Sequence, residues 1–271
     1  MQSNSIIYKF NLAILLLPFK KMKNILLKLF MNVTPPFIRD FYRNLKLKYV
    51  YKYSMSIHGL EDKFINIIGH KKNGFYIELG ANNGINQSNT FKLQKILHWD
   101  GILIEPNPTL AHECVINRSF ARSPQVSCAA CVPFGYEEHF VEIVDFGLMS
   151  VAKNLDIDSQ AIKAFHHNAI NYKNNRKTFV YGAVAKTLNE ILLTHNAPAN
   201  IDFLSLDVEG NEESVLRGID FDHFSFNFIL VEIYKNNKKV ASYLESQGYS
   251  FSKILSENPQ YSDILFSKSP L

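Results

Sequence analysis

Hydrophobic runs alternate with segments of helical periodicity from about Tyr53 to the end of the chain. The runs are almost continuously apolar, which is typical of parallel strands that are covered on both faces. Five of them are predicted strands: "FYIELG" (75–80), "GILIEP" (101–106), "QVSCAACV" (125–132), "IDFLSLDV" (201–208) and "NFILVEIY" (227–234).

Helices are predicted between these strands, where apolar residues recur three and four positions apart. They cover residues 88–97, 109–117, 187–195, 212–217 and 238–247. Two short runs, "GYSFSKI" (248–254) and "SDILFSK" (262–268), predict an antiparallel hairpin at the C-terminal edge of the sheet. The alternation indicates an α/β fold, with an open, mostly parallel sheet and helices on both faces.

Charge divides the chain into two parts. Residues 1–52 contain ten Lys or Arg and one acid, Asp40, although the net charge of all 271 residues is only +4. We therefore expect a basic N-terminal segment (1–52) and one large, nearly neutral domain (53–271). Within the domain, residues 133–182 form a long insertion with strand-like runs of its own, and insertions of this kind often act as a lid or substrate wall.

The basic segment resembles an arm rather than a nucleic-acid-binding surface, so no nucleic-acid partner is expected. Its run "NLAILLLPF" (11–19) is too short to span a bilayer. Apolar residues between Ile25 and Val33 recur at helical spacing beside lysines. A basic amphipathic helix of this type either lies on an anionic membrane or packs on the protein's own domain.

Three cysteines in a chain of this length favour a reducing compartment, and we expect a cytoplasmic protein. Cys128 and Cys131 form a C-x-x-C pair inside an apolar run. Burial as small hydrophobic residues is the simpler interpretation, with a metal or redox role as the alternative.

Candidate chemistry begins in the stretch "GFYIELGANNG" (74–84), where a strand ends at an acid and two glycines. Gly80 permits a tight turn, and Gly84 lets a ligand approach the backbone. A helix starting near Ser88 or Asn89 would direct backbone N–H groups at that ligand. A dinucleotide fingerprint needs a third close glycine, which is missing. Glu78 suits the ammonium group of an amino-acid tail better than a phosphate.

Glu105 ends the next strand, where a carboxylate can accept hydrogen bonds from both hydroxyls of a ribose. An adenosine with an ammonium-bearing tail and no phosphate is S-adenosylmethionine, and the two acids together indicate this cofactor. The alternative is that Glu78 and Glu105 only solvate the ends of their strands.

The third group of candidates lies in "LSLDVEGNE" (204–212). Asp207 ends a strand that we expect beside the first one, and either Asp207 or Glu209 could act as base for an attacking hydroxyl. Competing roles are ligation of a hard cation together with Glu232, although we assign no metal site, and a helix N-terminal charge for Glu209. The pair His166-His167 is a further candidate base, or a solvated part of a polar loop.

The sequence resembles the FkbM-type methyltransferases in "GLEDKFI", "GFYIELGANNGINQSNTF", "WDGILIEPNP", "FGLMS", "KTLNEILLTHNAPANIDFLSLDVEGNEESVLRGIDF" and "ILVEIY". The resemblance implies a Rossmann-like class I fold that binds S-adenosylmethionine. By position, Glu78, Gly80, Ala81, Asn82 and Gly84 would line the methionine side of the cofactor site, Glu105, Pro106 and Asn107 would hold the ribose, and Asp207 and Glu209 would lie at the reacting side.

The resemblance also implies O-methylation of a saccharide, glycoconjugate or small natural product. Two other functions are compatible with the same type of sheet. One is a methyltransferase-like binding domain without catalysis, and the other is a nicotinamide-dependent oxidoreductase, which the missing third glycine disfavours.

Overall fold

The computed structural model describes residues 55–119, 125–145, 150–153, 179–234 and 237–268, with Pro35 and Ile38. The basic segment 1–52, apart from these two residues, and His166-His167 lie outside the described part. The predictions made for them therefore stay predictions. The described residues from Met55 onward belong to one compact unit.

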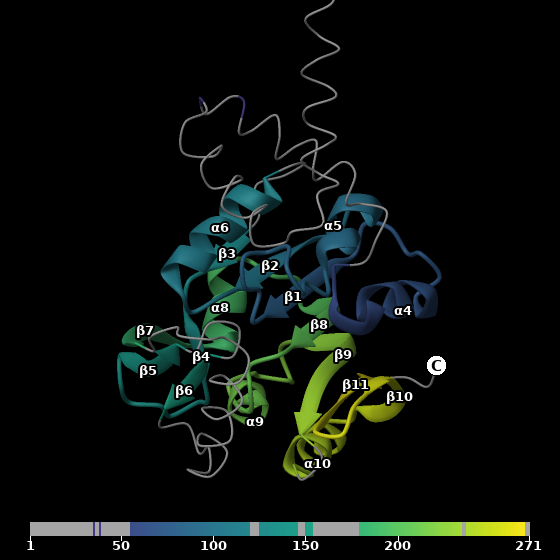
Figure 1. Ribbon diagram of the computed structural model, residues 1–271. Helices are drawn as coiled ribbons and strands as arrows, with labels where there is room; N and C mark the ends of the chain where they lie inside the picture. The colour runs from purple at the N-terminus through teal and green to yellow at the C-terminus, as the bar shows by residue number, and fades with distance from the viewer. Residues whose placement is uncertain are drawn as a thin grey trace, which may run out of the picture. The chain divides into compact units, whose positions relative to one another are not determined.

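A seven-stranded sheet forms the centre of this unit, in the order β10-β11-β9-β8-β1-β2-β3 (Figure 1). Its parallel strands are β1 (Phe75–Leu79), β2 (Asp100–Ile104), β3 (Gln125–Ser127), β8 (Asn200–Leu206) and β9 (Ser225–Tyr234). The antiparallel pair β10 (Ser250–Glu257) and β11 (Tyr261–Ser267) continues the sheet beyond β9. The predicted mostly parallel sheet with a C-terminal hairpin is thus confirmed.

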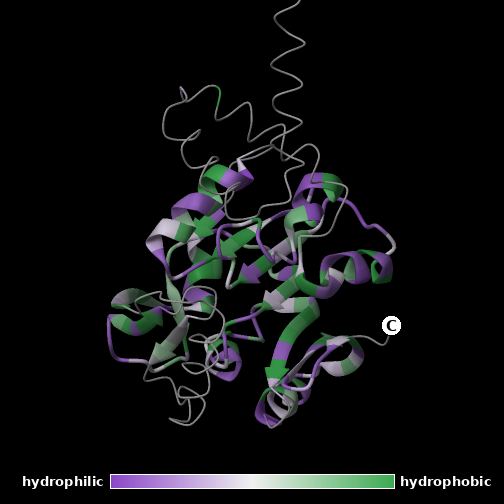
Figure 2. Ribbon diagram, in the orientation of Figure 1, coloured by the Kyte–Doolittle hydropathy of each residue, from purple (hydrophilic) through white to green (hydrophobic). Residues whose placement is uncertain are grey.

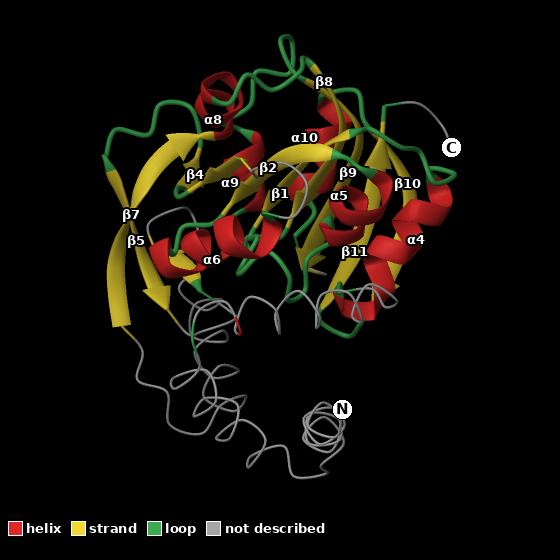
Figure 3. Cartoon of the chain, turned by 90° about the horizontal axis from the view of Figure 1, so that it is seen from above, coloured by secondary structure: helices red, strands yellow, loops and turns green. Residues whose placement is uncertain are grey.

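Helices cover both faces of this sheet (Figure 3). One face carries α4 (Leu60–Ile67), which follows the short 3-10 turn η1 (Ile57–Gly59), together with α5 (Phe91–Leu97) and α6 (Pro108–Arg118). The other face carries α8 (Leu188–Thr194), α9 (Glu212–Leu216) and α10 (Lys239–Ser246). Apolar residues of the strands are buried against each layer, and hydrophobic segments recur along the strands of the central sheet (Figure 2).

The strand alternation decides which residues meet which layer. In β1, Ile77 belongs to the core beneath α8, α9 and α10, whereas Tyr76 belongs to the core beneath α4, α5 and α6. Because successive side chains of a strand point to opposite faces, Glu78 shares the side of Tyr76. This directs the carboxylate of Glu78 toward α5 and α6.

The insertion and the residues that flank it form a second sheet, in the order β4-β7-β5-β6. It contains β4 (Ala130–Val132), β5 (Phe140–Asp145), β6 (Val151–Lys153) and β7 (Phe179–Thr187). The prediction of one strand over 125–132 is wrong, because β3 pairs with β2 of the central sheet and β4 pairs with β7. Cys128 and Ala129, which separate β3 from β4, are neither charged nor turn-forming residues, so the sequence pattern does not reveal the break.

The cysteine pair lies at this break. Cys131 is buried as expected, but Cys128 is exposed, and both are free thiols. No helix among the described residues is long and apolar enough to cross a membrane.

Candidate active site

A cavity of about 130 Å³ lies at the carboxyl ends of β1, β2 and β8. The cavity-lining residues that the sequence analysis also selected are Gly80, Asn82, Glu105, Pro106, Asp207 and Glu209. Ile143 and Ala152 of the second sheet add a wall. The structure therefore brings together residues from three predicted strand ends, at the edge where open α/β sheets bind ligands.

The turn after β1 is closely packed against β8. Gly80 has φ +75°, and a Cβ atom there would lie 2.0 Å from the backbone oxygen of Asp207. Its N–H and that of Ala81 both donate to the carbonyl of Ile104 at the end of β2. Only glycine fits this position, because any side chain would collide with the neighbouring strand. The turn is thus fixed to both flanking strands.

Side chains of helix α6 donate hydrogen bonds to the next part of the loop. Cys114 Sγ donates to the carbonyl of Asn82 (3.0 Å), and Asn117 Nδ2 donates to that of Asn83 (2.8 Å). The Nε–H of Arg118 donates to the carbonyl of Gly84. Because residues three and four apart share a face of a helix, one face of α6 binds three consecutive loop carbonyls.

Glu78 lies beneath this loop and does not line the cavity. Its carboxylate accepts hydrogen bonds from Ser88 Oγ (3.0 Å), the Asn89 N–H (2.7 Å), Thr90 Oγ1 (2.6 Å) and Arg118 Nη2 (3.2 Å). Arg118 is 0% exposed. Three of these bonds go to Oε2 and one, from the Asn89 N–H, goes to Oε1, so the second acceptor position of Oε1 is the one left unused by them. Direct contact between Glu78 and a cofactor stays a prediction, and it would use this position.

The helix after the loop also differs from the expectation. It begins after Thr90, not at Ser88 or Asn89, because these residues bend around Glu78. The Lys92 N–H donates to Glu61. The backbone N–H groups expected to point at a ligand therefore bind acids of the chain itself.

Glu105 has a different environment. Its oxygens accept the N–H groups of Asn82 and Asn107, each at 2.9 Å, which leaves acceptor positions facing the cavity. Burial raises the pKa of Glu105 to about 7, although both backbone bonds oppose this change. Asn107 is itself used as the N-cap of α6, through bonds from the N–H groups of Thr109 and Leu110.

The turn after β8 presents two carboxyl groups to the cavity, those of Asp207 and Glu209. Glu209 has φ +55° and accepts a hydrogen bond from the Tyr234 hydroxyl (3.4 Å). The suggested helix N-terminal role belongs instead to Glu212, whose carboxylate accepts from the Gly210 N–H (2.9 Å). Glu209 does not serve as this N-terminal charge and lines the cavity instead.

Further acids surround this turn. Burial, and then the negative charge of Asp263, raises the pKa of Asp207 to about 7. Burial and the neighbouring Asp207 raise the pKa of Glu232 to about 10, and the pKa of Glu209 is raised for the same two reasons. No group of three His, Cys, Asp or Glu residues in the described part of the chain could hold a metal ion.

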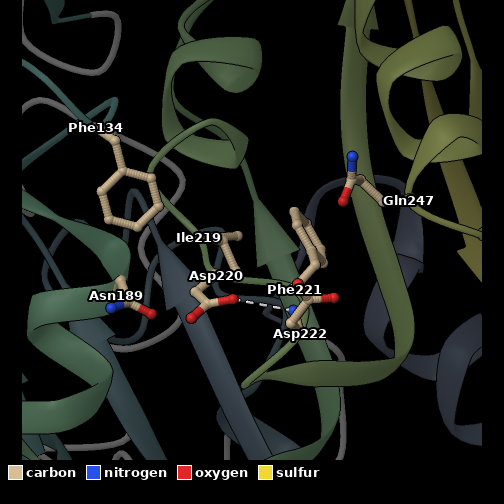
Figure 4. Close-up of a pocket in the computed structure, with 7 residues that line it drawn as sticks. All are labelled: Phe134, Asn189, Ile219, Asp220, Phe221, Asp222 and Gln247. Atoms are coloured by element: carbon tan, nitrogen blue, oxygen red, sulfur yellow. Dashed lines mark hydrogen bonds between the residues drawn. The ribbon is translucent and has the colours of Figure 1, made fainter.

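A second hollow lies elsewhere and includes Asp220, Phe221 and Asp222 (Figure 4). These residues precede β9, so they are at the opposite edge of the sheet from the strand ends described above. Asp220 Oδ1 accepts the N–H groups of Asp222 and His223, which makes it a turn-forming side chain. This hollow contains none of the candidate site residues of the sequence analysis.

Two residues of the site escaped the sequence analysis. Arg118 directly follows the predicted helix 109–117 and ends the observed α6, where a basic residue ordinarily interacts with the helix dipole in solvent. Asn211, at the start of α9, lines the cavity and is only 5% exposed. Its position next to Gly210 looks like an ordinary helix start, and only the packing reveals its burial.

Comparison with known proteins gives one family match. Residues 78–251 match the family described as "Methyltransferase FkbM domain". No curated protein matches the chain significantly.

Similar solved structures include magnesium protoporphyrin IX methyltransferase from Synechocystis PCC 6803 (8% identity, TM-score 0.42, covering 76% of each chain). Another is a SAM-dependent methyltransferase from Aquifex aeolicus (8% identity, TM-score 0.41, covering 77% of this chain and 89% of the other). A third is TrmK from M. capricolum in complex with S-adenosyl-homocysteine (10% identity, TM-score 0.40, covering 76% and 68%). These similarities are too weak to support a functional argument.

Proposed function

Since this chain belongs to the FkbM methyltransferase family, we propose that it uses S-adenosylmethionine to methylate a hydroxyl of a saccharide, glycoconjugate or small natural product. The observation that carries the proposal is the meeting of the glycine turn after β1, Glu105 and the Asp207–Glu209 turn around one cavity. In this proposal the glycine turn binds the amino-acid end of the cofactor, Glu105 binds its ribose, and the Asp207–Glu209 turn supplies the base.

The residues present fit this cofactor. Glu105 has acceptor positions for the hydroxyls of a ribose, because two backbone N–H groups are the donors that the described part of the chain directs at its carboxylate. The loop 80–84 is held by α6 through its carbonyls, so it is preformed for the amino-acid end. Bound S-adenosylmethionine would supply an electrophilic methyl group, and the chain supplies positioning and proton transfer.

Asp207 and Glu209 are the proposed bases for the acceptor hydroxyl. Burial and the negative charge of Asp263 raise the pKa of Asp207 to about 7, and burial and the neighbouring Asp207 raise the pKa of Glu209. A base whose pKa is near the working pH accepts a proton most effectively, which favours Asp207. Asp207→Asn should therefore reduce turnover by about a hundredfold or more. The cofactor affinity should fall much less, and the reverse pattern would make Asp207 a cofactor-binding residue.

Two measurements test the function as a whole. Calorimetric titration should detect S-adenosylmethionine binding and no NADH binding, and the opposite result would favour an oxidoreductase. Mass spectrometry of glycans and small metabolites, with and without the gene, should then reveal products that lack one CH₂ unit without the enzyme. Cofactor binding without any changed product would favour a noncatalytic binding domain.

The N-terminal segment 1–52 contributes membrane attachment in this proposal. Its ten basic residues would hold a cytoplasmic enzyme near anionic lipids, where glycoconjugates are assembled. A membrane-bound fraction should be released by moderate salt, since salt screens such attraction. Retention at high salt would contradict the electrostatic mechanism.

A further inference from the structure

Residues with a strained backbone line the cavity. Eight non-glycine residues of the described chain have a positive φ, and Asn82, Gln87 and Glu209 are the three that also line the cavity. His98 and Asn196 lie instead at the C-terminal ends of helices, where a left-handed residue is common. Asparagine tolerates this conformation, and Glu209 is already a proposed base. Gln87, at φ +65°, has no such explanation.

Hydrogen bonds on both sides hold Gln87 in this conformation. On the N-terminal side, Asn83 Oδ1 accepts the N–H groups of the residues two and three positions further on (3.1 and 2.9 Å), which closes a turn. On the C-terminal side, Ser88 donates to the buried carboxylate of Glu78 (3.0 Å). Because the chain is fixed before and after Gln87, the strain persists, and strain of this kind is typical of functional sites.

The side chain of Gln87 is exposed and lines the cavity. No residue of the described chain forms a hydrogen bond with its amide group. A carboxamide both donates and accepts hydrogen bonds, as a hydroxyl group does, so the two groups are complementary. The carboxylate of an amino-acid tail only accepts, so it would use half of what Gln87 offers. These properties favour a neutral ligand that carries hydroxyl groups.

Gln87 lies on the side of the cavity where methyl transfer is proposed. Two positions further along the chain, Asn89 Nδ2 donates to Ser205 Oγ of β8 (3.0 Å), and Asp207 directly follows β8. Glu105, the proposed ribose ligand, follows β2, and β1 separates β2 from β8 in the sheet. The turn that contains Gln87 is therefore tied to the strand of the proposed base, across β1 from the ribose ligand.

We propose that Gln87 binds the methyl acceptor, through a hydrogen bond between its amide group and a second hydroxyl of that acceptor. This inference rests on the proposed function and adds a residue that determines specificity. A saccharide carries several hydroxyls, and one fixed hydrogen bond selects which of them lies in line with the methyl group. The strained turn serves this role because it holds the amide at the cavity before the acceptor arrives.

Two substitutions in the full chain test the inference. Gln87→Leu keeps the size of the side chain without its hydrogen bonds, and Gln87→Gly removes the side chain while fitting the positive φ. Acceptor use is measured as transfer of a labelled methyl group from S-adenosylmethionine to a dialysed extract of source cells that lack the gene. At limiting extract, both variants should transfer the label about threefold to tenfold more slowly, as expected for the loss of one hydrogen bond.

The affinity for S-adenosylmethionine, measured by calorimetry, should stay unchanged in both variants. Gln87→Asn keeps the amide on a shorter side chain and should give an intermediate transfer rate. His98→Gly is the matched control, because His98 is exposed, has φ +59° and lies outside the cavity lining. It should transfer the label at the wild-type rate. Urea unfolding should show Gln87→Gly to be at least as stable as Gln87→Leu, since glycine adopts a positive φ without strain.

Wild-type transfer rates for Gln87→Leu and Gln87→Gly overturn this inference and leave the proposed function intact. A purely structural role for Gln87 predicts this result for the glycine variant. Weaker S-adenosylmethionine binding in both variants also overturns the inference, because Gln87 is then a cofactor-binding residue. If the wild type transfers no methyl group to the extract, the proposed function fails together with the inference.

Discussion

Arg118→Met removes the cation that joins the loop 80–84 to Glu78. The native guanidinium is 0% exposed and donates to Gly84, Thr90, Gln94, Ser88 and Glu78. Methionine has a similar length and fills much of the space, but it donates no hydrogen bond. The carboxylate of Glu78 is then buried at 3% exposure without an opposite charge.

The expected cost is large because the pair is buried. Removing one partner of a buried ion pair typically costs about 3–5 kcal/mol of unfolding free energy, since the other charge loses its compensation. Arg217→Met is the matched control. Arg217 pairs with Glu213 on the surface of α9, with its side chain 55% exposed, and such a pair contributes about 1 kcal/mol or less.

Urea unfolding followed by circular dichroism measures both changes. The double variant Arg118→Met/Glu78→Gln should recover at least about 1 kcal/mol of the loss, because the uncompensated carboxylate is gone. A cost below about 1 kcal/mol for Arg118→Met, or no recovery in the double variant, would refute the reasoning.

The same variants decide the role of Glu78. If Glu78 acts through the loop, Glu78→Gln should lower stability and cofactor affinity together. If it binds the ammonium group directly, affinity should fall while the urea midpoint stays near that of the wild type.

Three further predictions follow from single positions. Glu105→Ala should weaken S-adenosylmethionine binding in calorimetry, because each charge-assisted hydrogen bond contributes about 1.5–3 kcal/mol, and an unchanged affinity would remove Glu105 from the site. Gly80→Ala should lower both the melting temperature and the cofactor affinity, since its Cβ would lie 2.0 Å from the Asp207 carbonyl oxygen. Burial raises the pKa of Glu61 from 4.5 to about 7, so the protonated form is favoured in the folded state. The free energy of unfolding should therefore fall as the pH rises from about 4.5 to about 7, and Glu61→Gln should flatten this pH profile.

The fold could largely be predicted from the sequence because parallel strands covered on both faces are continuous apolar runs. Each predicted strand end with an acid or glycine therefore marks one edge of the sheet, and Gly80, Glu105 and Asp207 do meet there. What failed is the run 125–132, where two strands of different sheets follow each other without a polar break. The sheet that each of these strands joins depends on its pairing partner, β2 for β3 and β7 for β4, and neither partner lies within the run.

The site was harder to predict because its supports come from distant residues. Arg118 reaches Gly84 and Glu78 only because α6 packs across the loop. Asn211 is buried only because α9 lies against the cavity wall. One signal was available in the sequence: Glu78 stands between Ile77 and Leu79, so strand alternation already directs it to the opposite face.

The two acids that suggested the cofactor now have separate roles. Four donors of the chain occupy the carboxylate of Glu78, and one of them is a buried guanidinium. Among the described residues, two backbone N–H groups bind Glu105, and burial raises its pKa to about 7. A ligand with hydroxyl donors would therefore gain more at Glu105, where acceptor positions are free and new donors would stabilise the ionised form. Glu78 instead fixes the loop on which that ligand rests, so the loss of Glu105 should affect binding alone, whereas the loss of Glu78 should affect folding as well.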